Sequence, residues 1–260
     1  MCIAISEGTL AAAAPGAEAD IATLFDRAAA LGADGVELDG AGLENRIETV
    51  AEAMQRTGVA VAGIDFGRQG ALLSPDVNER EAALERLRSN ITCAVDLDAA
   101  GVVVVPHYGP VSMPDLAPWM APGELHAEML HMHLRTLSDF CRALGSRLFI
   151  QTAAAAETGF IWRLEQAGAV VKRIKHRDIQ IGVDLGCLVD EGGDPAEKLR
   201  TLATHLGYVR LPAEAVNRLE MPAVVEVLKS AGNVAWISLR GENAESLHSA
   251  ADRLRGALSA

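Results

Sequence analysis

One order of segments repeats along the whole chain: an amphipathic helix, then a glycine, then a short apolar strand. Residues 18–31 show the first copy, because their apolar side chains recur at helical spacing before Gly32 and the run GVEL at 35–38. The same order returns at five further glycines, which are Gly58, Gly101, Gly145, Gly207 and Gly232. Glycine adopts the left-handed conformation at a helix end more readily than other residues, so each one lets the chain turn into a strand. The repeat therefore predicts alternating helices and strands from end to end.

Eight strands are predicted when ISEG at the N-terminus and IQIGVD at 179–184 are included. Short runs rich in valine and isoleucine are typical of parallel strands that are buried on both faces. Eight βα units in about 250 residues indicate a closed (β/α)8 TIM barrel of the α/β class. The alternative, a doubly wound open sheet, would carry a glycine-rich phosphate loop, and neither GxGxxG nor GxxxxGK(S/T) occurs. No linker interrupts the pattern, so we predict one domain over residues 1–260.

Composition limits the partners of such a barrel. The 35 acidic and 23 basic residues give a net charge of −12, which disfavours binding to a nucleic-acid backbone or to anionic lipid. The four cysteines form no CxxC pair and are predicted to be reduced thiols. The N-terminus shows no secretory signal, and no apolar run reaches the ~20 residues of a membrane helix. We therefore expect a cytoplasmic protein with a small-molecule partner and with neither nucleic acid nor membrane as a partner, and a homo-oligomer is left open.

In a TIM barrel the active site lies at the carboxyl ends of the strands, where the βα loops begin. The sequence places polar side chains at these predicted ends. Along the chain they are Ser6, Glu7, Glu37, Asp39, Asp65, His107, Tyr108, Gln151, Asp184, Cys187, Arg210, Arg240 and Glu242. Because the ends of all eight strands meet at one face of the barrel, we expect the candidate site there.

Several segments carry a resemblance to a known family. They are LGADGVELDG, NEREAALERLRSNITCAVDLDAAGVVVVPHYGP, IGVDLGCLVDEGGDP, GYVRLPAE and VAWISLRGE. In this order and spacing, the whole chain resembles the xylose isomerase-like TIM barrels, which include sugar isomerases and epimerases, hydroxypyruvate isomerase, inosose dehydratase and endonuclease IV. The resemblance implies an isomerase or epimerase, with a dehydratase or lyase as related alternatives. The acidic charge disfavours the endonuclease activity.

The same resemblance implies a divalent cation held by Glu, Asp, His and Glu at the ends of strands five to eight. In this chain those positions hold Gln151, Asp184, Arg210 and Arg240. Cys187 stands where the family often has a second histidine. Guanidinium groups stay protonated, cannot ligate a cation, and at ~4–6 Å would repel it by several kcal/mol. We therefore predict that the site uses no metal and no other cofactor, while a shifted ligand set with Gln151 and Glu242 is left open.

Two arginines on neighbouring strands form a good receptor for a carboxylate or phosphate. We hypothesise that Arg210 and Arg240 replace the metal by holding an anionic or enediolate-like group of the substrate. Asp184 would then orient one arginine or move a proton, and His107 is a further acid–base candidate. Gln151 completes the predicted catalytic set. In the alternative, Asp184 pairs with the arginines and fills the pocket, which leaves a fold without chemistry.

Further residues are predicted to bind the substrate beside the two arginines. The loop from Pro106 to Glu124 is longer than most βα loops and contains Tyr108 and Trp119, which we interpret as a pocket wall or a partner contact. Glu37 is expected to face the mouth, either as a base or in a structural hydrogen bond. The basic run KRIKHR at 172–177 ends a helix at the opposite face, where cations favour the helix dipole, and is interpreted as solvated.

Together these patterns predict a sugar isomerase/epimerase-like protein. Its expected substrate is a small polar, anionic hydroxy-carbonyl metabolite, handled without the family's divalent metal. The second hypothesis is a non-catalytic barrel that binds a small anion. Both hypotheses place the ligand at the ends of strands seven and eight, so the surroundings of Arg210 and Arg240 distinguish them.

Overall fold

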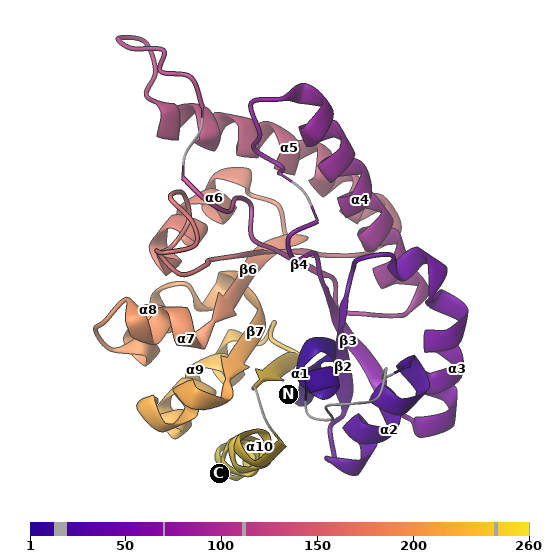
Figure 1. Cartoon of the computed structure of the whole chain (residues 1–260). Helices are drawn as coiled ribbons and strands as arrows, with labels where there is room; N and C mark the ends of the chain where they lie inside the picture. Colours follow the sequence, from indigo (N-terminus) through magenta and orange to yellow (C-terminus); the bar gives the residue numbers. More distant parts are fainter. Residues whose placement is uncertain (13–19, 70, 111–112, 242–243, 260) are drawn as a thin grey trace.

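Eight parallel strands and the helices between them make up the computed structural model, which describes residues 1–12, 20–69, 71–110, 113–241 and 244–259. The strands are β1 (Cys2–Ser6), β2 (Gly35–Asp39), β3 (Ala60–Asp65), β4 (Val102–Val104), β5 (Leu148–Gln151), β6 (Ile179–Asp184), β7 (Leu206–Pro212) and β8 (Trp236–Arg240). Each strand pairs with the next and β1 also pairs with β8, so the sheet closes into a barrel (Figure 1). The predicted (β/α)8 TIM barrel is confirmed.

Helices surround the barrel and connect each strand to the next (Figure 1). They are α1 (Glu7–Ala12), α2 (Ile21–Ala30), α3 (Ile47–Thr57), α4 (Val77–Asp96), α5 (Pro122–Leu144), α6 (Leu164–Ile174), α7 (Leu185–Asp190), α8 (Pro195–Thr201), α9 (Met221–Ala231) and α10 (Ala244–Ser259), with short 3-10 helices η1 (Leu43–Asn45), η2 (Ala203–His205) and η3 (Ala213–Arg218). Their apolar faces pack against the strands and form the larger hydrophobic core. Within the described ranges, no helix has the length and apolar character needed to cross a membrane.

Glycine ends three of these helices as the sequence predicts, and one of them is Gly232 after α9, with a φ of 73°. Gly58 after α3 has a φ of 74° and Gly145 after α5 has a φ of 73°, which is the left-handed conformation of a helix end.

Gly207 has a different role, because it lies inside β7 and does not precede it. A Cβ atom on Gly207 would come within 2.5 Å of Cε1 of Phe149, so this glycine makes room for an aromatic ring. The prediction of one role for every glycine of the repeat is therefore wrong at Gly207. It is also wrong at Gly101, because α4 ends at Asp96 and the left-handed residue that follows it is Asp98, with a φ of 51°.

Aromatic rings fill the inside of the barrel. Phe149 of β5 and Tyr208 of β7 stack with ring centroids 5.4 Å apart and form a small second core with Val103 of β4. Gly63 of β3 faces Tyr208, since a Cβ atom there would lie 3.0 Å from Cε2 of the tyrosine. The interior is therefore a packed core and not a channel, which leaves the strand ends as the place for a site.

The segment between β4 and α5 extends away from the barrel near the start of α5 (Figure 1). Leu116 and Met120 form an antiparallel bridge within it. Trp119 lies between these two residues and is 86% exposed to solvent. Trp119 therefore does not form the pocket wall that the sequence predicts, because its side chain points into solvent. The alternative interpretation, a contact with a partner, stays a prediction.

Candidate functional site

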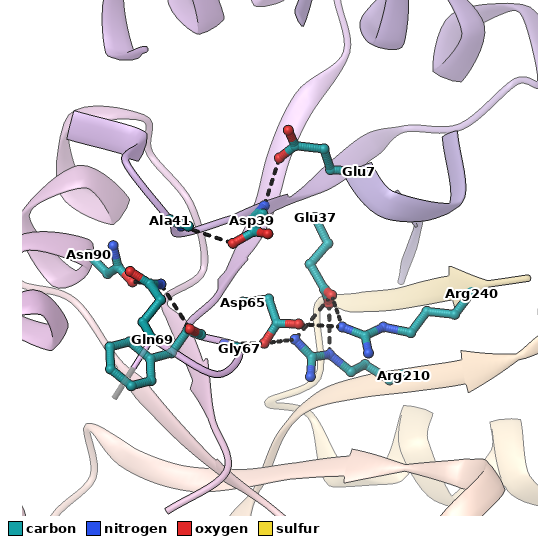
Figure 2. A network of polar contacts seen from close by, with 11 residues as sticks. Glu7, Glu37, Asp39, Ala41, Asp65, Gly67, Gln69, Asn90, Arg210 and Arg240 are labelled. Atoms are coloured by element: carbon teal, nitrogen blue, oxygen red, sulfur yellow. Dashed lines mark hydrogen bonds and ion pairs between the residues drawn. The ribbon is translucent and has the colours of Figure 1, made fainter. Parts of the chain in front are cut away.

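Four charged side chains meet at the carboxyl-terminal mouth of the barrel (Figure 2). Glu37 comes from β2, Asp65 ends β3, Arg210 lies in β7 and Arg240 ends β8. Glu37 and Arg240 stand 203 positions apart in the sequence and make contact because β1 pairs with both β2 and β8. Closure of the barrel therefore assembles this network.

Each guanidinium contacts both carboxylates. Arg210 donates Nε–H to Oε2 of Glu37 at 3.1 Å, and its Nη2 lies 3.1 Å from Oε1 of Glu37 and 2.9 Å from Oδ1 of Asp65. Arg240 donates through Nη2 to Oε1 of Glu37 and to Oδ2 of Asp65, both at 2.7 Å. Two positive and two negative charges therefore balance within one network.

Burial strengthens the coupling among these four groups. The side chains of Glu37 and Arg210 are 1% and 2% exposed, and those of Asp65 and Arg240 are 27% and 32% exposed. Burial opposes ionisation of the carboxyls, but the Arg210 and Arg240 guanidiniums outweigh it, holding the pKa of Asp65 at about 2 and the pKa of Glu37 below its ordinary value. Burial also opposes the charge on both arginines, and the two carboxylates nevertheless raise their pKa values. All four groups are therefore charged at neutral pH.

A cavity of about 590 Å³ opens beside this network. Glu37, Asp65 and Arg240 line it, whereas Arg210 is buried behind them and is not part of the lining. The cavity is bounded by the ends of β1, β2, β3, β6, β7 and β8 and by the residues that follow them. Arg240 is therefore the guanidinium that a bound molecule would meet.

Six carboxylate side chains belong to the lining of this cavity. They are those of Glu7, Glu37, Asp39, Asp65, Asp184 and Glu214. Glu7 is paired with Arg46 at 2.6 Å and also accepts a hydrogen bond from the backbone of Asp39 at 2.7 Å. Glu37 and Asp65 are paired with the arginines. The remaining three carboxylates, which are Asp39, Asp184 and Glu214, form no ion pair with any residue that the structure describes. The cavity therefore carries an excess of negative charge.

Asp184 ends β6 and lies at the cavity, outside the ion-pair network. Its Oδ1 accepts hydrogen bonds from the backbone N–H groups of Gly186 at 2.9 Å and Cys187 at 3.2 Å, which caps the start of α7. Burial raises the pKa of Asp184 above its ordinary value, and the backbone donors and the arginines only partly offset this effect. The hypothesis that Asp184 pairs with the arginines and fills the pocket is wrong, because two other carboxylates hold them and the cavity stays open.

Three further predicted residues lie outside the cavity lining. Gln151 ends β5 and is buried, and its Oε1 has no hydrogen-bond partner among the described residues. His107 is buried with Nε2 at 2.8 Å from the carbonyl oxygen of Pro110, so it holds the start of the β4–α5 segment. The ring of Tyr108 is covered by the Arg68 guanidinium at 3.9 Å from its centroid. Their predicted catalytic and binding roles stay predictions.

Asp65 is the network member to which the sequence assigns no role, although it is among the polar strand ends expected at the mouth. Two arginines in a buried mouth require carboxylates close by, and this requirement could have identified Asp65 from the sequence. Among the acidic strand ends, Glu37 and Asp65 lie on neighbouring strands and therefore meet the guanidiniums together. For Glu37, the structure supports the predicted structural hydrogen bond, here as part of an ion pair.

The donor atoms at the mouth do not fit a divalent cation. Hard cations require several oxygen ligands with net negative charge, and the positions where the family holds its metal supply one carboxylate, Asp184, with two guanidiniums. The oxygens of Glu37 and Asp65 already accept hydrogen bonds from those guanidiniums. In the described ranges, no group of three or more His, Cys, Asp or Glu side chains is arranged to hold a metal. Glu242, the other ligand considered, lies outside the described residues, and metal independence stays a prediction.

The sequence model of the family described as the xylose isomerase-like TIM barrel matches residues 25–251. The chain therefore belongs to this family, as the resemblance of its segments predicts. No curated protein matches it in sequence.

Solved structures share the fold over nearly the whole chain. The apo form of 3-keto-D-glucoside 4-epimerase, YcjR, from E. coli has a TM-score of 0.84 at 21% identity and covers 98% of this chain and 99% of its own. D-psicose 3-epimerase from Clostridium cellulolyticum H10 with D-tagatose has a TM-score of 0.81 at 16% identity and covers 99% of both chains. The IOLI protein with a zinc atom has a TM-score of 0.75 at 14% identity and covers 99% of this chain and 96% of its own. At these identities the likeness shows the fold alone.

Proposed function

We propose that this protein is an epimerase- or isomerase-type enzyme that moves a proton beside the carbonyl group of an uncharged sugar or similar hydroxy-carbonyl compound, without a divalent metal. Membership of the family supports this reaction class, and two similar structures are of sugar epimerases. One observation carries the proposal: the Arg240 guanidinium lines an open cavity and is oriented by two carboxylates. A fixed cation in that position can stabilise a developing oxyanion.

Charge balance favours an uncharged substrate and revises the anionic one that the sequence predicts. Both guanidiniums are already matched by carboxylates, so the network offers no net positive charge. A carboxylate or phosphate group in the cavity would be repelled by Asp39, Asp184 and Glu214. The hydroxyl groups of a sugar, in contrast, can donate hydrogen bonds to these same carboxylates. The cavity therefore suits a neutral polyhydroxy compound.

Asp184 is the base in this proposal. It lines the cavity, and one of its oxygens, Oδ1, is held by two backbone N–H groups, which fixes the carboxylate in place. Burial raises its pKa, and a carboxylate with a raised pKa is a stronger base at neutral pH. Asp184 takes the proton from the carbon next to the carbonyl, and the electron pair of that C–H bond moves towards the carbonyl oxygen. Delivery of a proton to the opposite face of the same carbon gives the epimer. Delivery to the former carbonyl carbon, with the neighbouring hydroxyl proton passing to the former carbonyl oxygen, gives the isomer.

Arg240 receives the negative charge that forms on the substrate oxygen. Its Nη2 is used by Glu37 and Asp65, while its Nη1 has no hydrogen-bond partner among the described residues. The charge–charge contacts hold the guanidinium in one orientation before substrate binds, so little reorganisation is needed during the reaction. Arg210, buried behind the cavity, is a positioning residue that keeps Glu37 and Asp65 in place.

Proton abstraction can be tested before the product is known. Keto-sugars are incubated with the protein in D2O, and NMR follows deuterium uptake at the carbon beside the carbonyl. We expect exchange with at least one keto-sugar, and a loss of about 10²–10⁴-fold in Asp184→Asn, because this change removes the base. Glu226→Gln, which removes an exposed carboxylate outside the cavity lining, is the control and should retain exchange within a few-fold.

Two results would overturn the proposal in separable ways. Saturable sugar binding by calorimetry without any deuterium uptake would mean that the barrel binds its ligand without catalysis. Exchange that disappears after EDTA treatment and returns with Mn²⁺ or Zn²⁺ would mean that a metal takes part. Exchange that survives EDTA but is lost in Arg240→Ala is the outcome that the geometry predicts.

A further inference from the structure

A second cavity lies at the opposite, amino-terminal end of the barrel. It has a volume of about 470 Å³, which is within the range of small-ligand sites. Its walls come from the end of α6 and the start of β6, from η2 before β7, and from Asn233 before β8. The basic residues of its lining are Lys172, Lys175, His176, Arg177 and His205. This cavity is separate from the candidate active site, which lies at the other ends of the strands.

The charge of this cavity is opposite to that of the protein. The chain has a net charge of −12, yet no carboxylate belongs to the part of this lining that the structure describes. Two of the four lysines in the sequence, Lys172 and Lys175, are in the lining, and neither forms an ion pair within the described ranges. Asp178 lies outside the lining, 3.6 Å from both Nδ1 of His176 and Nε of Arg177, and offsets those two groups in part.

The loop that carries these cations has a defined shape. Lys175 follows α6 in the left-handed conformation with a φ of 54°, and its N–H bonds to the carbonyl oxygen of Val171. His176 is mostly buried and contacts Arg142 of α5 through Nε2. Lys172, Lys175 and Arg177 are exposed, as expected for a solvated helix end. The turn also places the two lysines in the lining of one cavity.

We propose that this amino-terminal cavity binds a small anion of the phosphate class, with Lys172 and Lys175 as its main contacts. An ammonium group attracts the doubly charged phosphate as a point charge, and two of them in one concave site favour it over a monovalent ion. The histidines and Asn233 add polar groups around the same space. The proposal does not depend on the reaction at the other end of the barrel.

Calorimetry and thermal denaturation with inorganic phosphate test this site. Sodium chloride at equal ionic strength is the reference, and glucose 6-phosphate tests whether a phosphate ester binds as well as the free ion. We expect saturable phosphate binding in the native protein and affinity about ten-fold weaker or worse in Lys172→Ala/Lys175→Gly. Glycine at position 175 removes the charge and favours the left-handed backbone already present, so this variant should stay folded.

A control pair removes the same charge elsewhere. Lys229 and Arg135 are exposed helical residues outside the cavity lining, so Lys229→Ala/Arg135→Ala should bind phosphate within about two-fold of the native protein. Equal weakening in both double variants, or unchanged binding in both, would overturn the proposal. So would stabilisation by sodium chloride equal to that by phosphate. Should the double variant unfold, Lys172→Ala alone makes the same comparison with Lys229→Ala.

Discussion

Arg210 is a charged side chain in an almost fully buried position, and its neighbours explain why it is tolerated. Glu37 accepts from its Nε and lies beside its Nη2, while Asp65 contacts Nη2 from a second side. A buried guanidinium without such partners would carry a large desolvation cost. At the residue scale, ion pairs of Glu37 and Asp65 with the two arginines therefore fix the positions of the charged side chains at the mouth of the barrel.

Replacing Glu37 by Gln should destabilise the fold strongly. The change leaves the shape of the side chain but removes the charge that both guanidiniums contact, and breaking one side of a buried ion pair costs about 3–5 kcal/mol. Urea denaturation measures the free energy of unfolding. Glu214→Gln is the control and should change it by less than about 0.5 kcal/mol, since Glu214 is exposed and makes no ion pair among the described residues. Equal effects would contradict this account.

Asp65 should make the stability depend on pH below pH 4. Its pKa falls from 3.8 to about 2 on folding, because Arg210 and Arg240 outweigh the effect of burial. A lowered pKa in the folded state contributes stability that is present above pH 4 and is lost as the pH falls through about 2. Over that window the native protein should lose roughly 2 kcal/mol more than Asp65→Asn, in unfolding free energies measured from pH 6 to pH 2. Parallel pH profiles for the two proteins would refute the assigned pairing.

At the scale of elements, glycines on the strands let aromatic rings occupy the barrel interior. Gly207 of β7 lies against Phe149 of β5, and a Cβ atom there would also come within 2.3 Å of Oε1 of Gln180 on β6. The three strands are consecutive neighbours in the sheet. The packing of β5, β6 and β7 therefore requires glycine at position 207, because the neighbouring side chains occupy the space that a Cβ atom would need.

Gly207→Ala is expected to destabilise the protein by about 1–3 kcal/mol, the usual cost of forcing extra volume into a packed core. Gly256→Ala is the opposite case, because Gly256 lies in α10 and an added Cβ atom would meet nothing within 4 Å. Alanine favours the helix, so this control should raise stability by about 0.4–1 kcal/mol. Chemical denaturation of both variants compares them. Similar changes of the same sign would show that Gly207 is not required by packing.

For the whole molecule, the pairing of the first strand with the last determines both the closed sheet and the position of the candidate site. β1 pairs with β8 over four residue pairs, from Cys2 with Trp236 to Ile5 with Leu239. This pairing removes both open edges of the sheet and brings β2 and β3 to the arginines of β7 and β8. Fold and candidate site therefore depend on the same event.

A chain that stops after Asn233 lacks β8 and α10 and should fail to form a stable barrel, because β1 and β7 would then present unpaired edges. Soluble yield and near-UV circular dichroism measure the outcome. A chain that stops after Gly256 keeps β8 and most of α10 and should remain folded. A native-like spectrum from the shorter chain would show that closure is not needed for folding.

The helix–glycine–strand repeat determined the barrel, because periodicity and helix ends are local properties that each segment carries by itself. It also determined that polar strand ends such as Asp184, Arg210 and Arg240 share one face. Only the tertiary structure decided their partners: Glu37 lies 173 positions from Arg210 and 203 from Arg240, and no local pattern encodes a contact at that separation. The sequence alone predicted two arginines free to hold an anion. The folded chain neutralises them with Glu37 and Asp65, because a guanidinium that leaves water needs a carboxylate beside it.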